Sequence, residues 1–137
     1  DWINRAMVNA AKLGGSALVV DMWMPIIASP KFLNKVKSNA LVFENYKPLD
    51  KNDGILKLME GALSENWSFD WSKINVSTLV MTGHLDKMFR IPKDVEDLVK
   101  KIKNPITLEL PTCGHLIPLE EPEQFSDHII NFVKNLN

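Results

Sequence analysis

Two side chains that could perform acid–base chemistry together follow two short apolar segments in the second half of the chain. Asp86 comes shortly after residues 77–82, an apolar and β-branched run that stops at Gly83, and His115 follows a similar run over residues 106–110. A neutral imidazole has a pKa of about 6.5 and can remove a proton from a hydroxyl or thiol nucleophile. A carboxylate bonded to its second ring nitrogen fixes the tautomer and stabilises the imidazolium that forms. Asp86 and His115 are therefore the candidate catalytic residues.

The segment between these two runs predicts how the pair is brought together. Residues 92–103 place apolar side chains at the i, i+3, i+4, i+7 spacing of a helix with one buried side, namely Val95, Leu98, Val99 and Ile102. Strand, helix and strand form a βαβ unit of an α/β fold, whose two strands run parallel with adjacent carboxyl ends. Gly83 and Gly114 are expected to let the chain turn sharply as it leaves each strand. An aspartate in a turn or a lone histidine is usually structural, but this order and spacing favour a catalytic pair.

Two motifs carry a resemblance to a known family. The sequence LVMTGHLD at residues 79–86, followed by CGHLIPLEEPEQF at residues 113–125, resembles the C-terminal part of an α/β-hydrolase of the serine hydrolase type. The resemblance extends from residue 74 to the end of the chain, with Ser77 standing where the family often has proline. It implies that Asp86 and His115 are the acid and the base of a Ser-His-Asp triad whose serine lies earlier in the chain. No G-x-S-x-G motif occurs in this sequence, so the nucleophile and the oxyanion hole are expected outside these residues.

The part of the chain before the first strand is predicted to be helical. Four helices are expected, at residues 2–13, from Ser16 to Pro25, from the Ser29-Pro30 pair to Leu41, and at 55–63. Residues 1–66 resemble, in position and character, the helical cap that α/β-hydrolases often insert before the acid-bearing strand. Residues 67–137 would then be the C-terminal βαβα part of the core, entered through Trp67, Phe69 and Trp71 and closed by a helix over 122–136.

A cap of this kind would select the substrate. Large, adaptable apolar side chains there could bind an apolar ester or acyl group, and the candidate substrate-binding residues are Met22, Trp23, Met24 and Phe32. The alternative is that methionine and aromatic residues at helical spacing pack against a neighbouring helix, as most such residues do.

Composition excludes several classes of function. Sixteen basic and 17 acidic residues give a net charge of −1, which offers no electrostatic attraction for nucleic acid. With 45% hydrophobic residues, the 137-residue chain can form a core, although a complete α/β-hydrolase needs a longer sheet. Neither a long apolar span nor a leader pattern is apparent, so we expect no membrane span and a cytoplasmic location. The abrupt start in a helical pattern is interpreted as that of a fragment.

Other candidate sites are weaker. Ser16 follows two glycines, as in a nucleophile elbow, but is more consistent with a helix cap. Cys113, the single cysteine, is too close to His115 along one turn to act as its nucleophile and is predicted to be a small buried side chain. His84, Asp86 and His115 match no metal-binding signature, so neither a metal nor another cofactor is expected. Glu120 and Glu121 precede Pro122, where acidic groups favour a helix N-terminus, and are given no catalytic role.

The predicted function is hydrolysis of a carboxylic ester or thioester, in which this chain supplies cap, acid and base. A missing N-terminal half or another chain would supply the nucleophile, and the 137-residue chain alone is expected to be inactive. The alternative is a non-catalytic ligand-binding or interaction fragment of the same fold. The residue at the missing elbow would decide: serine indicates the esterase, aspartate a dehalogenase or epoxide hydrolase, and an inert residue the binding protein.

Overall fold

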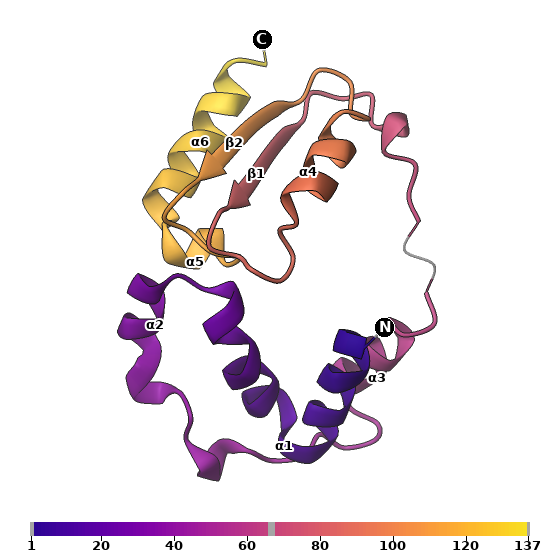
Figure 1. The fold of residues 1–137 in the computed structure, drawn as a ribbon, viewed down its shortest axis with the longest axis vertical. Coiled ribbons are helices and arrows are strands. Elements are labelled where there is room, and N and C mark those ends of the chain that lie inside the picture. The colour runs from indigo at the N-terminus through magenta and orange to yellow at the C-terminus, as the bar shows by residue number, and fades with distance from the viewer. Residues whose placement is uncertain (1, 66–67, 137) are drawn as a thin grey trace. The chain divides into compact units, whose positions relative to one another are not determined.

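The computed structural model describes residues 2–65 and 68–136, so Trp67, expected to lead into the sheet, lies outside the described residues. The chain forms two compact units. The first consists of Asp1–Met24 and Lys35–Ser68, and the second of Pro25–Asn34 and Phe69–Asn137. The first is helical, and the second contains both strands (Figure 1). The fold class is therefore α/β, as predicted. Residues 25–34, from the expected cap, belong to the unit that holds the sheet.

The long N-terminal helix α1 (Trp2–Ile27) is broken at Gly15, which has φ 70° and ψ −164°. This break confirms the predicted boundary at Gly14 and Gly15. A Cβ at position 15 would overlap the carbonyl oxygen of Lys47, so glycine is needed both for the positive φ and for this close approach. The second half continues beyond Pro25 to Ile27, two residues further than predicted.

Helix α1 also corrects the expectation that the chain has no long apolar span. By length and composition alone, Trp2–Ile27 is a candidate membrane span near the N-terminus. The break at Gly15 divides it into two segments, each shorter than the roughly 20 residues that a spanning helix needs. Val8, Ala10 and Ala11 on the first segment are already buried within the protein.

The rest of the first unit consists of short helices and 3-10 turns. Helix α2 (Pro30–Val36), which begins in the second unit, is followed by 3-10 turns η1 (Lys37–Asn39) and η2 (Phe43–Asn45), and then by α3 (Gly54–Gly61). The prediction that the third helix reaches Leu41 is wrong, because the chain tightens into η1 and Leu41 itself has a positive φ of 57°. The core of this unit joins α1 to α3 and is formed by Val8, Ala11 and Leu56, with Val19, Leu49 and Met59 against them.

The second unit is built on two parallel strands, β1 (Leu79–Gly83) and β2 (Ile106–Leu110). They pair in register from Leu79 with Ile106 to Gly83 with Leu110, which confirms the predicted parallel βαβ unit. The sheet is preceded by the 3-10 turn η3 (Trp71–Lys73), and its helices are α4 (Pro92–Val99), α5 (Ile117–Glu120) and α6 (Pro122–Lys134). Helices α4 and α6 lie on opposite faces of the strands (Figure 1). The short helix α5 was not predicted.

The core of the second unit lies directly beneath the end of β2. Leu110, Cys113 and Ile117 are buried together, with Met81, Leu108 and Phe125 packed against them. Within the part of the chain that the structure describes, β1 and β2 pair only with each other. Each strand therefore keeps one unpaired edge among the described residues.

Candidate active site

Asp86 is fixed in the turn that follows β1. Its backbone N–H donates to the carbonyl of Gly83 at 3.3 Å, and its carboxyl oxygen Oδ1 accepts hydrogen bonds from the backbone N–H groups of Met88 (3.0 Å) and Phe89 (2.9 Å). The residue is only 5% exposed. A buried carboxyl group is stable only when its oxygens are hydrogen-bonded, so the turn holds Oδ1 and leaves Oδ2 to bind a further group.

That further group is His115, which follows β2. Its ring nitrogen Nδ1 lies 2.8 Å from Oδ2 of Asp86, and its backbone N–H donates to the carbonyl of Ile27 at 2.7 Å. The Phe89 ring packs on the imidazole, with 4.6 Å between ring centroids and a tilt of 41°. The structure thus brings together the two side chains that the sequence paired, 29 positions apart in the chain.

Only one ring nitrogen of His115 is used in this contact. Because a carboxylate accepts and does not donate, Nδ1 carries the proton and Nε2 has a free lone pair in the neutral ring. Among the described residues Nε2 makes no hydrogen bond, and the His115 side chain is 44% exposed. The acid is therefore buried while the base faces outward, which is the arrangement that lets a histidine accept a proton from an incoming group.

The two glycines beside the pair are needed for close approach rather than for an unusual backbone. Neither Gly83 nor Gly114 has a positive φ. A Cβ at Gly83 would lie 2.6 Å from the carbonyl oxygen of Cys113 and closer still to that of Gly114. The two turns touch backbone to backbone, and the N–H of Leu85 donates to the carbonyl of Cys113 at 2.9 Å. Absence of a side chain at these positions thus brings Asp86 within hydrogen-bonding distance of His115.

A pocket of about 230 Å³ opens beside the pair. Its walls come from β1, the turn after it, α4 and the His115 turn, and they consist of Met81, Thr82, Gly83, Asp86, Phe89, Arg90, Val95, Gly114, His115 and Ile117. The lining is mostly apolar and includes the polar side chains of Thr82, Asp86, Arg90 and His115, as in sites for small organic ligands.

A second histidine–carboxylate pair lies at the carboxyl end of the same sheet. His84 Nε2 is 2.8 Å from Glu109 Oε2, and Arg90 donates to Glu109 Oε1 at 3.1 Å. The hydrogen bond from His84, and after it that from Arg90, lowers the pKa of Glu109. His84 is thus bonded to a different carboxyl group from His115. No group of three or more His, Cys, Asp or Glu side chains suited to a metal ion occurs among residues 2–65 and 68–136.

Cys113 is fully buried, as predicted. Burial raises the pKa of its thiol to about 11, and the nearby charges of Glu120 and Glu121 act in the same direction. A thiol with this pKa stays protonated at neutral pH, so it is not a nucleophile. Its role is to fill the core under the His115 turn.

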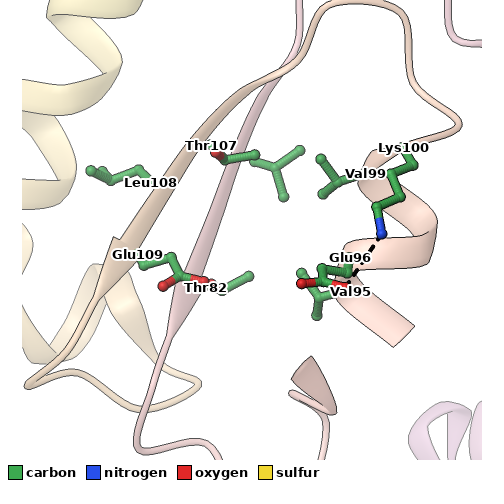
Figure 2. Close-up of a pocket in the computed structure, with 9 residues that line it drawn as sticks. Thr82, Val95, Glu96, Val99, Lys100, Thr107, Leu108 and Glu109 are labelled. Atoms are coloured by element: carbon green, nitrogen blue, oxygen red, sulfur yellow. Dashed lines mark hydrogen bonds and ion pairs between the residues drawn. The ribbon is translucent and has the colours of Figure 1, made fainter. Parts of the chain in front are cut away.

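Another pocket, of about 220 Å³, lies between α4 and the sheet (Figure 2). It is lined by Val80, Thr82, Val95, Glu96, Val99, Lys100, Thr107, Leu108 and Glu109. Figure 2 shows the ion pair between Lys100 and Glu96 along its outer wall, with an N–O distance of 3.4 Å. Neither Asp86 nor His115 lines it, but it shares Thr82 and Val95 with the pocket beside the pair.

Of the four predicted substrate-binding residues, Phe32 belongs to the same unit as the pocket beside His115 and does not line it. In the first unit, Met22 is 47% exposed, Met24 is half-buried and Trp23 is 8% exposed. Phe32, in the second unit, is half-buried on α2. Their contact with a substrate remains a prediction, and the burial of Trp23 is that of a packing residue.

Sequence reasoning missed Glu120, which is 8% exposed. Its Oε2 accepts hydrogen bonds from the N–H groups of Ser29 and Gly114, both at 2.9 Å, and its Oε1 accepts from Leu116 at 3.2 Å. We predicted an acidic residue favouring the N-terminus of the last helix, but the carboxyl group turns inward instead. Its position five residues after His115 was the one available signal, and it gives no indication of the partner at Ser29.

Comparison with known proteins supports the fold. No protein-family model and no curated protein sequence matches the chain. Among solved structures, a thermophilic esterase from Thermogutta terrifontis, studied with malate bound, is similar with a TM-score of 0.73 and 19% sequence identity, over 97% of this chain and 49% of the esterase. A probable hydrolytic enzyme from Pseudomonas aeruginosa PAO1 is similar with a TM-score of 0.55 and 16% identity, over 96% of this chain and 47% of that protein. The chain spans about half the length of these structures, and its fold is that of part of a hydrolase.

Proposed function

We propose that this chain supplies the acid and the base of a serine hydrolase that cleaves carboxylic esters or thioesters, with Asp86 and His115 completing a Ser-His-Asp triad. One observation carries the proposal. His115 Nδ1 is bonded to the buried Asp86 at 2.8 Å, and the His115 side chain is 44% exposed at the carboxyl ends of two parallel strands. Chemistry in open α/β sheets is located at these ends. The similarity to an esterase and to a probable hydrolytic enzyme supports the same class.

The mechanism follows from Nε2 of His115, which makes no hydrogen bond among the described residues. Nε2 of His115 takes the proton of the serine hydroxyl as its oxygen attacks the carbonyl carbon, and Asp86 stabilises the imidazolium through Nδ1. Nε2 then gives this proton to the leaving alcohol or thiol as the bond to the acyl carbon breaks. Water attacks the acyl-enzyme, loses a proton to Nε2, and the carboxylic acid leaves with the serine restored.

The serine and the oxyanion donors come from outside these 137 residues, either from an N-terminal half of the same protein or from another chain. Both strands of the sheet have an unpaired edge among the described residues, and further parallel strands would pair there. The substrate is a small apolar ester or acyl compound, consistent with the mostly apolar walls beside His115. The 137-residue chain alone does not hydrolyse esters under this proposal.

The first test asks where the nucleophile is. The native protein is purified, its intact mass and the mass of each denatured polypeptide are measured, and a fluorophosphonate probe is added. We expect a longer chain or a second polypeptide, labelled at a serine. A native protein of 15.5 kDa only that hydrolyses p-nitrophenyl acetate, with loss of this activity in His115→Ala, would refute the assignment of the serine to another part.

The second test uses the matched pair of histidines in the complete protein. His115→Gln should lower kcat for p-nitrophenyl acetate at least about 10³-fold, and Asp86→Asn about 10⁴-fold, as for other triads. His84→Gln is the control, because His84 also bonds a carboxyl group at this sheet edge but not Asp86. Equal losses in His84→Gln and His115→Gln, or no loss in either, would contradict the proposed triad.

A further inference from the structure

Glu120 lies outside the hydrogen-bonded pair but touches the backbone on both sides of His115. The three successive amides of this turn all have defined acceptors. Gly114 donates to Glu120 Oε2 at 2.9 Å, His115 to the carbonyl of Ile27 at 2.7 Å, and Leu116 to Glu120 Oε1 at 3.2 Å. The backbone that carries the imidazole is therefore held by one side chain and one carbonyl.

The same carboxyl group also holds the segment that supplies the second acceptor. Glu120 Oε2 accepts from the N–H of Ser29, 91 positions away in the sequence. Two residues before Ser29, the carbonyl of Ile27 binds His115, and that of Ile26 accepts from Lys87, the residue after Asp86, at 3.1 Å. Residues 26–29 thus contact the turn of the acid and the turn of the base, and Glu120 ties them to the latter.

The site is shaped to admit this side chain. A Cβ at Gly114 would lie 2.7 Å from Glu120 Oε1 and 2.8 Å from the Cα of Ala28, so glycine leaves the space through which the carboxyl group approaches. Glu120 is 8% exposed, and both of its oxygens accept from N–H donors. An amide at this position has one acceptor oxygen and would present an NH₂ group to at least one N–H donor.

We propose that Glu120 is a positioning residue for His115: its carboxyl group joins the His115 turn to residues 26–29 and so sets the distance between the imidazole and Asp86. Glu120 does not touch reacting atoms, and its effect is carried by the backbone of Gly114 and Leu116. The catalytic consequence of this role rests on the proposed function, but the positioning itself does not.

The test compares the complete native protein with its Glu120→Gln and Glu120→Ala variants by NMR. In Glu120→Ala, we expect amide exchange at Gly114 and Leu116 to rise roughly 10- to 100-fold, as for loss of a hydrogen bond to a charged acceptor. The Nδ1–H signal of His115 should broaden or vanish. Glu120→Gln should give a smaller change, confined to the donors that face the amide NH₂.

Two control variants separate positioning from general loss of stability. Glu121→Gln changes the neighbouring acidic residue, which bonds Lys31 at 3.0 Å rather than the His115 turn, and should leave the His115 signal in place. Ile102→Val removes a buried methyl elsewhere in this unit and should lower overall stability without selective exchange at Gly114.

Unchanged exchange at Gly114 and Leu116 with an unchanged His115 signal in Glu120→Ala would overturn the inference. Unfolding of both Glu120 variants would also overturn it, since Glu120 would then support the whole unit rather than this turn. In the complete protein, Glu120→Gln should lower kcat with little change in KM. If His115→Gln leaves activity intact while the NMR changes occur, the proposed function fails and the positioning role stands.

Discussion

Replacing Gly83 by alanine perturbs the contact between the turn of the acid and the turn of the base. The new Cβ would lie 2.6 Å from the carbonyl oxygen of Cys113 and closer still to that of Gly114, whereas real Cβ atoms essentially never come within 3.0 Å of another heavy atom. Both neighbours are backbone atoms in a packed turn, so they cannot rotate away as a flexible side chain would. The two turns must separate.

The magnitude follows from the contacts that this separation breaks. Overpacking at a tight site costs about 1–3 kcal/mol. Hydrogen bonds from His84 to Leu110 (3.0 Å) and from Leu85 to Cys113 (2.9 Å) join the two turns, and each contributes about 0.5–1.5 kcal/mol. Alanine restricts the unfolded chain and returns about 0.4–1 kcal/mol. The net expected loss is about 1–6 kcal/mol in the free energy of unfolding of the second unit.

The assay is amide hydrogen exchange of β1 and β2, which reports opening of this unit, together with the NMR signal of the His115 Nδ1 proton. Gly61→Ala is the matched control, because a Cβ there has nothing within 4 Å and the residue ends α3. It should be neutral or stabilising by up to about 1 kcal/mol. A loss below about 1 kcal/mol in Gly83→Ala, with the His115 signal unchanged, would refute the close-approach argument.

Two further predictions concern stability. Burial raises the pKa of the Cys113 thiol from 9.0 to about 11, so the folded state favours the protonated thiol. Below about pH 9 this preference adds at most about 3 kcal/mol to the free energy of unfolding. The added stability is lost as the pH rises to about 11. Urea midpoints at pH 8 and pH 11 should therefore fall further apart for the wild type than for Cys113→Ala, and equal differences would contradict the burial argument. Asp53 caps α3 by accepting from the N–H of Ile55 at 2.8 Å, so Asp53→Ala should cost about 0.5–2 kcal/mol while Asp53→Asn costs less, as measured by urea unfolding monitored by circular dichroism; equal costs would argue against the cap.

Much of the second unit could be predicted from its sequence because its signals are local. Apolar runs bounded by glycine and proline marked both strands, and the spacing from Val95 to Ile102 marked the helix between them. Parallel pairing then followed from the length of the connection, and proximity of Asp86 and His115 followed from parallel pairing. Each step used only neighbouring residues and the geometry of a βαβ unit.

The features that sequence reasoning missed depend on contacts between distant residues. From the sequence, Glu120 is predicted only to precede the N-terminus of a helix. Its hydrogen-bond donor Ser29, however, lies 91 positions earlier in the chain. Residues 25–34 were placed with the cap because they continue a helical pattern, whereas the carbonyls of Ile26 and Ile27 accept hydrogen bonds from the sheet unit. Nothing in periodicity encodes such pairings, since a backbone carbonyl has the same chemistry at every residue.

Asp86 and His115 differ in burial, because the Asp86 carboxyl group is buried and the His115 side chain is 44% exposed. Asp86 is buried and would be costly without partners, but two backbone N–H groups and His115 satisfy its carboxyl oxygens. The hydrogen bond between His115 Nδ1 and Asp86 Oδ2 would therefore stabilise a non-catalytic protein as well. The same bond leaves the His115 side chain 44% exposed, with no hydrogen bond at Nε2 among the described residues, so Nε2 is available for a proton transfer. A proton transfer at Nε2 of His115 distinguishes a hydrolase from a binding fragment. Fluorophosphonate labelling that falls with His115→Gln and persists with His84→Gln indicates the hydrolase. Absence of labelling in the native protein indicates the binding fragment.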